Sequence, residues 1–420
     1  MMSRFRLPWR RILPEPCPGT RGSAGTCVRV RASSSSSSSS RLVLGIESSC
    51  DDTGAAVLDE AGVVLGESLH SQKEVHLKTG GIIPTVAQQL HREHIAHVVQ
   101  EALTRSGVTP GQLAAVATTV KPGLALSLGV GLRFSLQFVR RHRKPFIPIH
   151  HMEAHALTAR MLRPVAFPFL VLLISGGHAL LALARGVNDF LLLGQTLDEA
   201  PGDTMDKIAR RLSLTKHPRC SALSGGQALE LLAREGDRSK FNFKTPMGQH
   251  YDCNFSFAGM RNQVTMTIRQ QEEVEGVGPG TVLSCVNDIA AATQHTIARQ
   301  LAKRTHRAIV FCKAKALLPT SNPTLVVSGG VASNQYFRKA LTVITDATGL
   351  HLLCPPASLC TDNGVMIAWN GVERLREGRG ILPFDQEVSY EPKAQLGVDI
   401  TADVKQANIK LPSVKLRIAD

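Results

Sequence analysis

Residues 42–58 read LVLGIESSCDDTGAAVL, and this stretch sets the pattern from which the fold is predicted. Two short apolar runs flank a polar turn, an arrangement typical of a β-hairpin. Serine hydroxyls and free backbone N–H groups in such a turn can hold a phosphate. The acids beside them would repel a bare phosphate, which favours a bridging cation or a ribose contact. Serine and aspartate are also common in plain turns, so this turn alone leaves both interpretations open.

The same arrangement recurs twice further along the chain. An apolar run at 169–174 precedes Ser-Gly-Gly-His at 175–178, and a run at 324–327 precedes Ser-Gly-Gly-Val-Ala-Ser-Asn at 328–334, with a helix expected over 335–342. Glycines allow the backbone to approach a ligand closely, and a helix amino terminus favours an anion or an adenine-ribose group. Three such turns at strand ends favour a nucleotide cleft. None matches the P-loop or the dinucleotide-binding fingerprint, which disfavours both of those classes.

A pair of histidines gives the sharpest chemical signal. His151 and His155 lie four positions apart, which on a helix places both imidazoles on one face. Such a pair suits a divalent metal, although histidines at this spacing also occur by chance on solvated helices. Met152 follows the first histidine, so the pattern is not that of a zinc protease. Asp362 opens an apolar helix and could either complete the metal site or cap that helix.

Composition excludes several classes of protein. The chain has 420 residues, of which 43% are hydrophobic and 20% charged, as in ordinary globular proteins. No apolar run approaches the roughly 18–20 residues that cross a bilayer, so membrane insertion is not expected. Nine cysteines without a Cys-x-x-Cys pair disfavour a disulfide framework and an all-cysteine zinc site.

The amino-terminal segment differs from the rest of the chain. Residues 1–41 hold eight arginines and one acid, Glu15, so they carry +7, half of the formal net charge of +14. A segment rich in arginine and serine and poor in acids is typical of an organellar transit peptide. Ser33–Ser40 predicts a flexible linker. We therefore expect a transit peptide and linker over 1–40 and a mitochondrial matrix location, the alternative being a disordered tail without an address.

Taken in order, eight motifs between about 42 and 375 make the chain resemble the universal tRNA threonylcarbamoyladenosine transferases, in particular their mitochondrial members. The motifs are Gly45–Thr53, Gly80–Pro84, His151–His155, Ser175–His178, Asp206-Lys207, Ser256–Gly259, Ser328–Asn334 and Cys360–Asn363. This resemblance implies the actin-like ATPase fold, shared with sugar kinases, actin and heat-shock chaperones, in which two related α/β lobes enclose a nucleotide cleft. The expected limits are 42–149 for the first lobe, completed by about 365–385, then 150–364 for the second lobe and 386–420 for an extension.

The resemblance also implies the activity and the site. The family transfers a threonylcarbamoyl group from threonylcarbamoyl-adenylate to N6 of the adenosine 3′ of the anticodon (position 37) in tRNAs that read codons starting with A, and AMP leaves. One divalent metal cation per subunit would be held by His151, His155 and Asp362. The implied substrate-binding residues are Leu173, Ile174, Ser175, Gly176 and Gly177 for the phosphate and acyl portion, Asp206, Gly226, Glu230 and Asn334 for the ribose and adenine, and Ser333 beside them. A homodimer is also implied.

The chemistry agrees with these groups. The mixed anhydride is already activated, whereas the adenine amine is a poor nucleophile because its lone pair is delocalised. A metal at the phosphate or carbonyl would withdraw charge, and backbone donors at Gly176 and Gly177 would stabilise developing negative charge. No side chain stands out as a general base. Zinc, iron, manganese and nickel all suit histidine plus carboxylate ligands.

Three basic clusters are candidates for contact with tRNA phosphates. They are Arg140–Lys144, Arg210-Arg211 with Lys216 and Arg219, and Lys303-Arg304 with His306-Arg307. Any single cluster is as readily a solvated surface.

Three alternative functions remain. A small-molecule kinase of the same fold is disfavoured by the histidine pair, because magnesium prefers oxygen ligands. A metalloprotease is disfavoured because its glutamate base is misplaced. A nucleotide-switched scaffold would need no histidine site.

Overall fold

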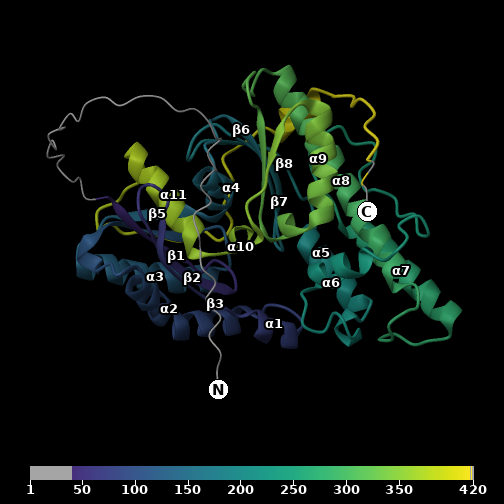
Figure 1. The fold of residues 1–420 in the computed structure, drawn as a ribbon, viewed down its shortest axis with the longest axis horizontal. Helices are drawn as coiled ribbons and strands as arrows, with labels where there is room; N and C mark the ends of the chain where they lie inside the picture. Colours follow the sequence, from purple (N-terminus) through teal and green to yellow (C-terminus); the bar gives the residue numbers. More distant parts are fainter. Residues whose placement is uncertain (1–39, 417, 419–420) are drawn as a thin grey trace, which may run out of the picture. The chain divides into compact units, whose positions relative to one another are not determined.

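The structure is a computed structural model that describes residues 40–416 and 418 of the chain. The predicted transit peptide and serine linker, 1–40, lie outside the described residues except for Ser40. Two β-sheets organise the described part (Figure 1).

The first sheet has five strands in the order β3-β2-β1-β4-β5. Their bounds are β1 Leu42–Glu47, β2 Asp52–Leu58, β3 Val64–Ser71, β4 Leu113–Lys121 and β5 Phe146–His150. β1 and β2 pair antiparallel, with Glu47 opposite Gly54, which confirms the hairpin predicted for 42–58. β4 pairs parallel with β1 on its other side. The polar turn therefore lies at one end of the two central strands.

Helices cover both faces of this sheet. Leu44 and Ile46 pack on one face with α2 (Pro84–Ser106) and α3 (Ala125–His142). Val43 faces the opposite way, toward α11 (Gly364–Glu377), as the two-residue period of a strand requires. A short helix, α1 (Lys73–Thr79), and a 3-10 turn (Pro110–Gln112) complete this half.

The second sheet has six strands in the order β10-β9-β6-β7-β8-β11. Their bounds are β6 Phe169–Ile174, β7 Ala179–Ala184, β8 Phe190–Gln195, β9 Thr324–Ser328, β10 His351–Leu353 and β11 Val398–Asp399. β6 pairs antiparallel with β7 and parallel with β9. The glycine turns after β6 and β9 therefore lie side by side at the carboxyl ends of these two strands. The two later strand-and-turn predictions are thus confirmed.

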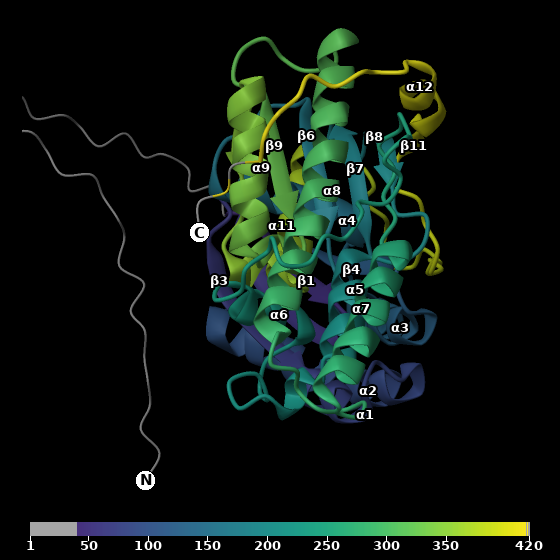
Figure 2. The same cartoon turned by 90° about the vertical axis from the view of Figure 1, so that its right-hand side faces the viewer.

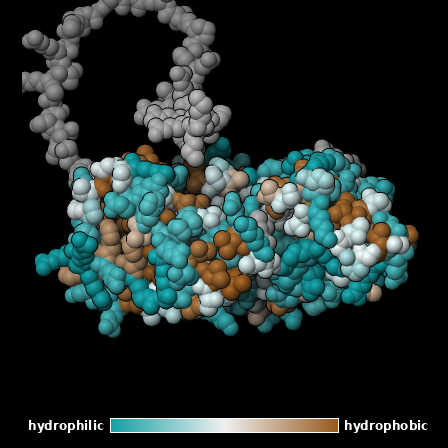
Figure 3. Space-filling view, turned by 90° about the horizontal axis from the view of Figure 1, so that it is seen from below, coloured by the Kyte–Doolittle hydropathy of each residue, from teal (hydrophilic) through white to brown (hydrophobic). Residues whose placement is uncertain are grey.

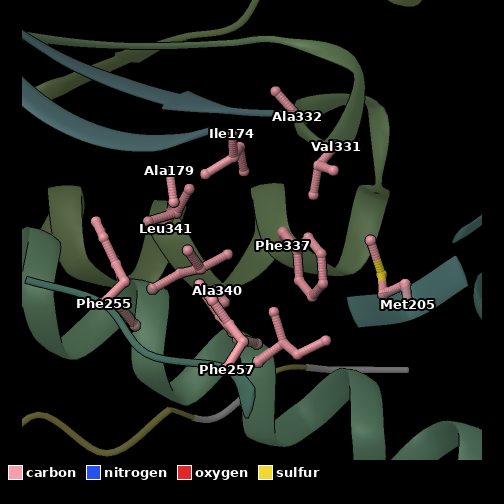
Figure 4. Packing of buried hydrophobic residues seen from close by; sticks show 14 of the residues in the cluster. Ile174, Ala179, Met205, Phe255, Phe257, Val331, Ala332, Phe337, Ala340 and Leu341 are labelled. Atoms are coloured by element: carbon pink, nitrogen blue, oxygen red, sulfur yellow. The ribbon is translucent and has the colours of Figure 1, made fainter. Parts of the chain in front are cut away.

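One apolar core on the outer face of this sheet is formed largely by helices. The helices are α5 Pro201–Arg211, α6 Gly225–Ala233, α7 Ala258–Glu275, α8 Val286–Ala314, α9 Gln335–Thr348 and α12 Thr401–Gln406, with 3-10 turns at Leu214–Lys216 and Gly330–Ser333. Figure 2 shows α8 and α9 lying over β6, β7 and β9. In Figure 4, Ile174 at the end of β6 and Ala179 at the start of β7 face α9, which contributes Phe337 and Leu341 to the same core. The helix expected over 335–342 continues to Thr348 because Ile344 and Thr345 remain buried in this core.

A second core lies between the two sheets. It combines Val43 and Ala56 of the first sheet, Val171 of the second, and buried residues of α4 (His151–Leu162) and α11. Both helices that carry or adjoin the predicted metal ligands therefore run between the sheets. α10 (Ala357–Cys360) leads into the turn before α11.

Residues after 380 contact both sheets. Leu382 forms an antiparallel bridge with Phe146 of β5, and the amide of Glu391 donates to the carbonyl of Val120 in β4. β11 then pairs with β8, and Val404 is fully buried. The sequence suggested no role for this segment. The predicted lobe limits and the extension at 386–420 stay predictions.

The face in Figure 3 is mostly hydrophilic, with apolar residues in separate patches. Among the residues that the structure describes, no helix has the length and apolar character needed to span a bilayer.

Candidate metal centre and substrate-binding turns

Three side chains from distant parts of the chain converge between the sheets. α4 starts at His151, and the rings of His151 and His155 lie edge to face with centroids 4.7 Å apart. Asp362 Oδ1 lies 3.1 Å from Nε2 of His155 and 3.4 Å from Nε2 of His151. One possible ligand atom from each residue falls within a group no wider than 4.8 Å. Two imidazole nitrogens and one carboxylate oxygen fit a divalent transition metal and leave positions open for substrate.

The turn before α11 is placed by close backbone packing. A Cβ added to Gly364 would lie 2.4 Å from the carbonyl carbon of Ala55, so only glycine lets α11 approach β2 this closely. Asn363, and not Asp362, caps α11, because its side chain accepts from the amide of Met366 at 2.8 Å. The helix-cap alternative for Asp362 is therefore wrong, and its carboxylate points to the histidines.

A buried glutamate, which the sequence did not single out for this site, stands behind His151. Glu47 ends β1 with no exposed surface, and its Oε2 lies 3.2 Å from Nδ1 of His151. Ser49 Oγ lies 3.1 Å from the same nitrogen. The available signal was an acid inside an apolar strand end, a position that costs free energy unless the charge has a partner.

These contacts shift the pKa values of the centre. Burial alone would lower the pKa of His151, but the carboxylates of Asp362 and Glu47 outweigh it and raise the pKa to about 10. Burial would raise the pKa of Asp362, yet His151 and His155 hold it well below its usual range. The His151 ring and the carboxylates around it therefore stabilise one another's charged forms.

His178 adds a third imidazole close to this set. It ends the turn between β6 and β7, where the amide of Ser175 donates to its carbonyl at 2.9 Å. Burial, together with His151 and His155, lowers the pKa of His178 to about 4. At neutral pH this ring is therefore uncharged.

The turn at 175–178 lies open beside α5. Added Cβ atoms at Gly176 and Gly177 would meet no atom of the described residues within 4 Å. On the other side, the amide of Gly202 donates to the carbonyl of Ser175 at 3.1 Å, which fixes the turn against the start of α5. Leu173 and Ile174 are buried strand residues, so only their backbone lies next to this turn.

The remaining predicted substrate residues form a second group. Asp206 Oδ1 accepts from the amide of Gly226 at 3.2 Å, which joins α5 to α6. Glu230 Oε1 accepts from the amide of Gln335 at 2.9 Å, at the start of α9 and two residues from Ser333. Asn334 is 5% exposed, and its side chain accepts from the amide of Phe337 and donates to Gln294, so it points inward.

Many cations of the predicted basic clusters already pair with other residues of the protein. Arg211 pairs with both carboxylate oxygens of Glu272, and Arg219 pairs with Glu235. Arg304 is 1% exposed and donates to the carbonyls of Met247, His250 and Asp252; Arg307 donates to the last two. By contrast, Arg140, Arg141 and Arg143 are exposed at the end of α3. The cluster at 303–307 thus holds a loop of the protein and offers little charge to a phosphate.

Comparison with known proteins identifies the family. Residues 63–369 match the family model described as tRNA N6-adenosine threonylcarbamoyltransferase. A mitochondrial protein of that name from Danio rerio is 73% identical, covering 90% of this chain and 93% of that protein. One from Homo sapiens is 62% identical, covering 90% and 91%. One from Paramagnetospirillum magneticum, without the mitochondrial label, is 38% identical, covering 86% and 98%.

A solved structure supports the fold alone. HypF from T. kodakarensis superposes with a TM-score of 0.51 at 15% identity, covering 80% of this chain and 48% of that one. The fold is the predicted actin-like ATPase fold. On the family match and on relatives that align over nearly their whole length, the chain belongs to the tRNA N6-adenosine threonylcarbamoyltransferase family of enzymes.

Proposed function

We propose that this enzyme transfers the threonylcarbamoyl group of threonylcarbamoyl-adenylate to N6 of the adenosine 3′ of the anticodon, with release of AMP. The acceptors would be mitochondrial tRNAs that read codons starting with A. The names of the relatives support the tRNA substrate and the mitochondrion, and we extend the location to the matrix. The observation that carries the proposal is the convergence of His151, His155 and Asp362.

In this proposal the two groups of residues bind different parts of the substrate. The turn at 175–177 would receive the phosphate and acyl portion, where exposed backbone donors suit developing negative charge. Asp206, Gly226 and Glu230 would hold the ribose and adenine, together with the backbone of Ser333 and Asn334. These assignments follow the family resemblance residue by residue.

His151, His155 and Asp362 would hold one divalent cation per subunit. When bound, this cation supplies positive charge at the mixed anhydride and so assists departure of AMP. We assign to the neutral imidazole of His178, near His151 and His155, the role of taking the proton that the adenine amine would release. A protease is not supported, because Glu153 lies buried against Arg374 at 2.5 Å and is not available as a base.

The test uses the chain from Arg41 onward with threonylcarbamoyl-adenylate and unmodified tRNA. Nucleoside mass spectrometry would measure threonylcarbamoyladenosine for wild type, His151→Ala and the control His250→Ala, whose side chain is 57% exposed. We expect product from wild type and the control only. Product from all three proteins would remove the metal centre from the mechanism, and no product from any of them would contradict the activity.

We also propose the homodimer implied by the resemblance. Analytical ultracentrifugation at micromolar protein should give twice the monomer mass, and a single monomeric species would contradict it.

A further inference from the structure

The back of the His151 ring is held by a carboxylate that belongs to neither the metal ligands nor the substrate turns. Glu47 Oε2 lies 3.2 Å from Nδ1 of His151, while Nε2 of the same ring faces Asp362. We propose that Glu47 is a positioning residue for the metal centre: it accepts the Nδ1–H of His151 and so directs the Nε2 lone pair at the cation. This inference rests on the proposed metal site.

The carboxylate is fixed from three sides. Its Oε1 accepts from the amide of Ser49 at 2.5 Å, and its Oε2 accepts from the hydroxyl of Thr119 at 2.5 Å as well as facing His151. These donors come from the hairpin turn, from β4 and from α4. A carboxylate held by three separate elements has little freedom, so the ring that it contacts is held in one orientation.

The cost of burying this charge argues for a role beyond packing. Glu47 has no exposed surface, and a buried carboxylate is unfavourable unless it is paired and hydrogen-bonded. Ser49 and Thr119 could be satisfied by an uncharged acceptor. The partner in reach is the His151 ring, which a cation bound at Nε2 would make more positive. Acceptors behind a ligating histidine fix its tautomer and raise its basicity.

The two histidines of the centre therefore differ. Nδ1 of His151 faces both Glu47 and Ser49, whereas Nδ1 of His155 is buried and has no hydrogen-bond partner among the residues that the structure describes. Glu47 thus acts on one ligand only. Its loss should weaken the metal site without removing it.

The first experiment measures metal affinity and not tRNA modification, so it is independent of turnover. Co²⁺ would be titrated into wild type, Glu47→Gln and Thr119→Val against a competing chelator, with the visible absorption of bound Co²⁺ as the signal. We expect Glu47→Gln to bind about 10–100-fold more weakly. Thr119→Val keeps the carboxylate and the ring but removes one of the three donors that fix the carboxylate, so it should weaken binding less than Glu47→Gln does. Circular dichroism without metal would confirm that each variant is folded.

A second measurement needs no variant. In Zn²⁺-loaded wild type labelled with ¹⁵N-histidine, long-range proton–nitrogen spectra should show that the ligating ring of His151 carries its proton on Nδ1. His151→Ala assigns that signal by its loss. Metal carried by Nδ1, or equal Co²⁺ affinity of wild type and Glu47→Gln, would overturn the inference and leave the proposed activity standing. Equal weakening by Thr119→Val would reduce Glu47 to a packing role, and wild type that binds no Co²⁺ would overturn the metal site as well.

Discussion

At the scale of single residues, Asp362 stands 207 positions after His155, yet its carboxylate lies 3.1 Å from that imidazole. Asp362→Ala should leave two neutral ligands, which is too few for a tight site. We expect Co²⁺ affinity to fall by more than about 100-fold, the upper range for losing an outer partner. Absorbance titration measures this, with exposed Asp346→Ala as the matched control. Retained affinity would show that Asp362 is not a ligand.

His178 provides a different prediction, because it lies near the centre without being one of the three ligands. Its lowered pKa, about 4, keeps the ring neutral at pH 7. We expect His178→Asn to lower kcat by about 10²–10⁴-fold, the usual contribution of a general base, while Co²⁺ affinity changes little. Single-turnover product formation measures the loss of rate, and Co²⁺ titration measures the metal affinity. An unchanged kcat would exclude His178 as the proton acceptor.

The sequence predicted only part of this site. The four-residue spacing of His151 and His155 was enough to place them on one helix face, as their 4.7 Å ring separation confirms. Nothing in the spacing could bring Asp362 to them, because that proximity depends on how α11 packs on β2. Glu47 was missed because an acid at the end of an apolar strand does not show which residue will be its partner, and His151 lies 104 positions away. Arg304 was misjudged because the spacing of basic residues does not show which of them turn inward.

At the scale of elements, α4 and α11 must keep a fixed spacing for the centre to form. Arg374 donates to Glu153 at 2.5 Å, and Arg160 donates to Glu373 at 2.9 Å. The indole N–H of Trp369 also donates to the carbonyl of Leu157 at 3.0 Å. The helix that carries the histidines is thus joined to the helix that follows the aspartate.

Breaking one of these pairs should be costly. Arg374→Met leaves the Glu153 carboxylate buried without its partner, and we expect a loss of about 3–5 kcal/mol in the free energy of unfolding. Urea denaturation measures it. The double variant Glu153→Met with Arg374→Met should recover most of this loss, because no lone charge remains. If the single and double variants were equally unstable, packing volume rather than charge would be the cause.

The strands and helices that have a clear local sequence pattern were predicted best. The strands within 42–58 and 169–184 were predicted correctly because short apolar runs bounded by polar turns are local properties, and these strands are buried almost throughout. α9 was expected to end near residue 342, but it extends to Thr348, since its last turn is stabilised by a distant core. Residues 386–416 had no motif, and their place depends on pairing with β8 and β4 and on the burial of Leu396 and Val404 in the two cores.

At the scale of the whole molecule, burial of neutral histidines should make stability depend on pH. Burial, with Arg238 and Arg299, lowers the pKa of His295 to about 4, against about 6.5 in an unfolded chain. The unfolded state therefore binds the proton first, and stability falls as pH falls from 6.5 toward 4. Because the ring is partly exposed, we expect only about 1 kcal/mol from this residue.

The comparison is between urea unfolding at pH 7 and at pH 5. His295→Asn should show a smaller loss of stability between the two values than wild type does. The exposed His250→Asn should behave as wild type. An identical pH dependence in all three proteins would mean that His295 titrates normally in the folded state.

The covering of the first sheet has a consequence for how the protein is made. β1 to β5 are complete once residue 150 has been synthesised, but the helix that closes their inner face spans 364–377. A nascent chain, which grows from its amino terminus, therefore displays an unshielded apolar surface during most of its synthesis. Asp362, the third of the proposed metal ligands, is made equally late. Chains that terminate early should be recognised by chaperones and proteases, and those that stop before Asp362 cannot form the proposed metal centre.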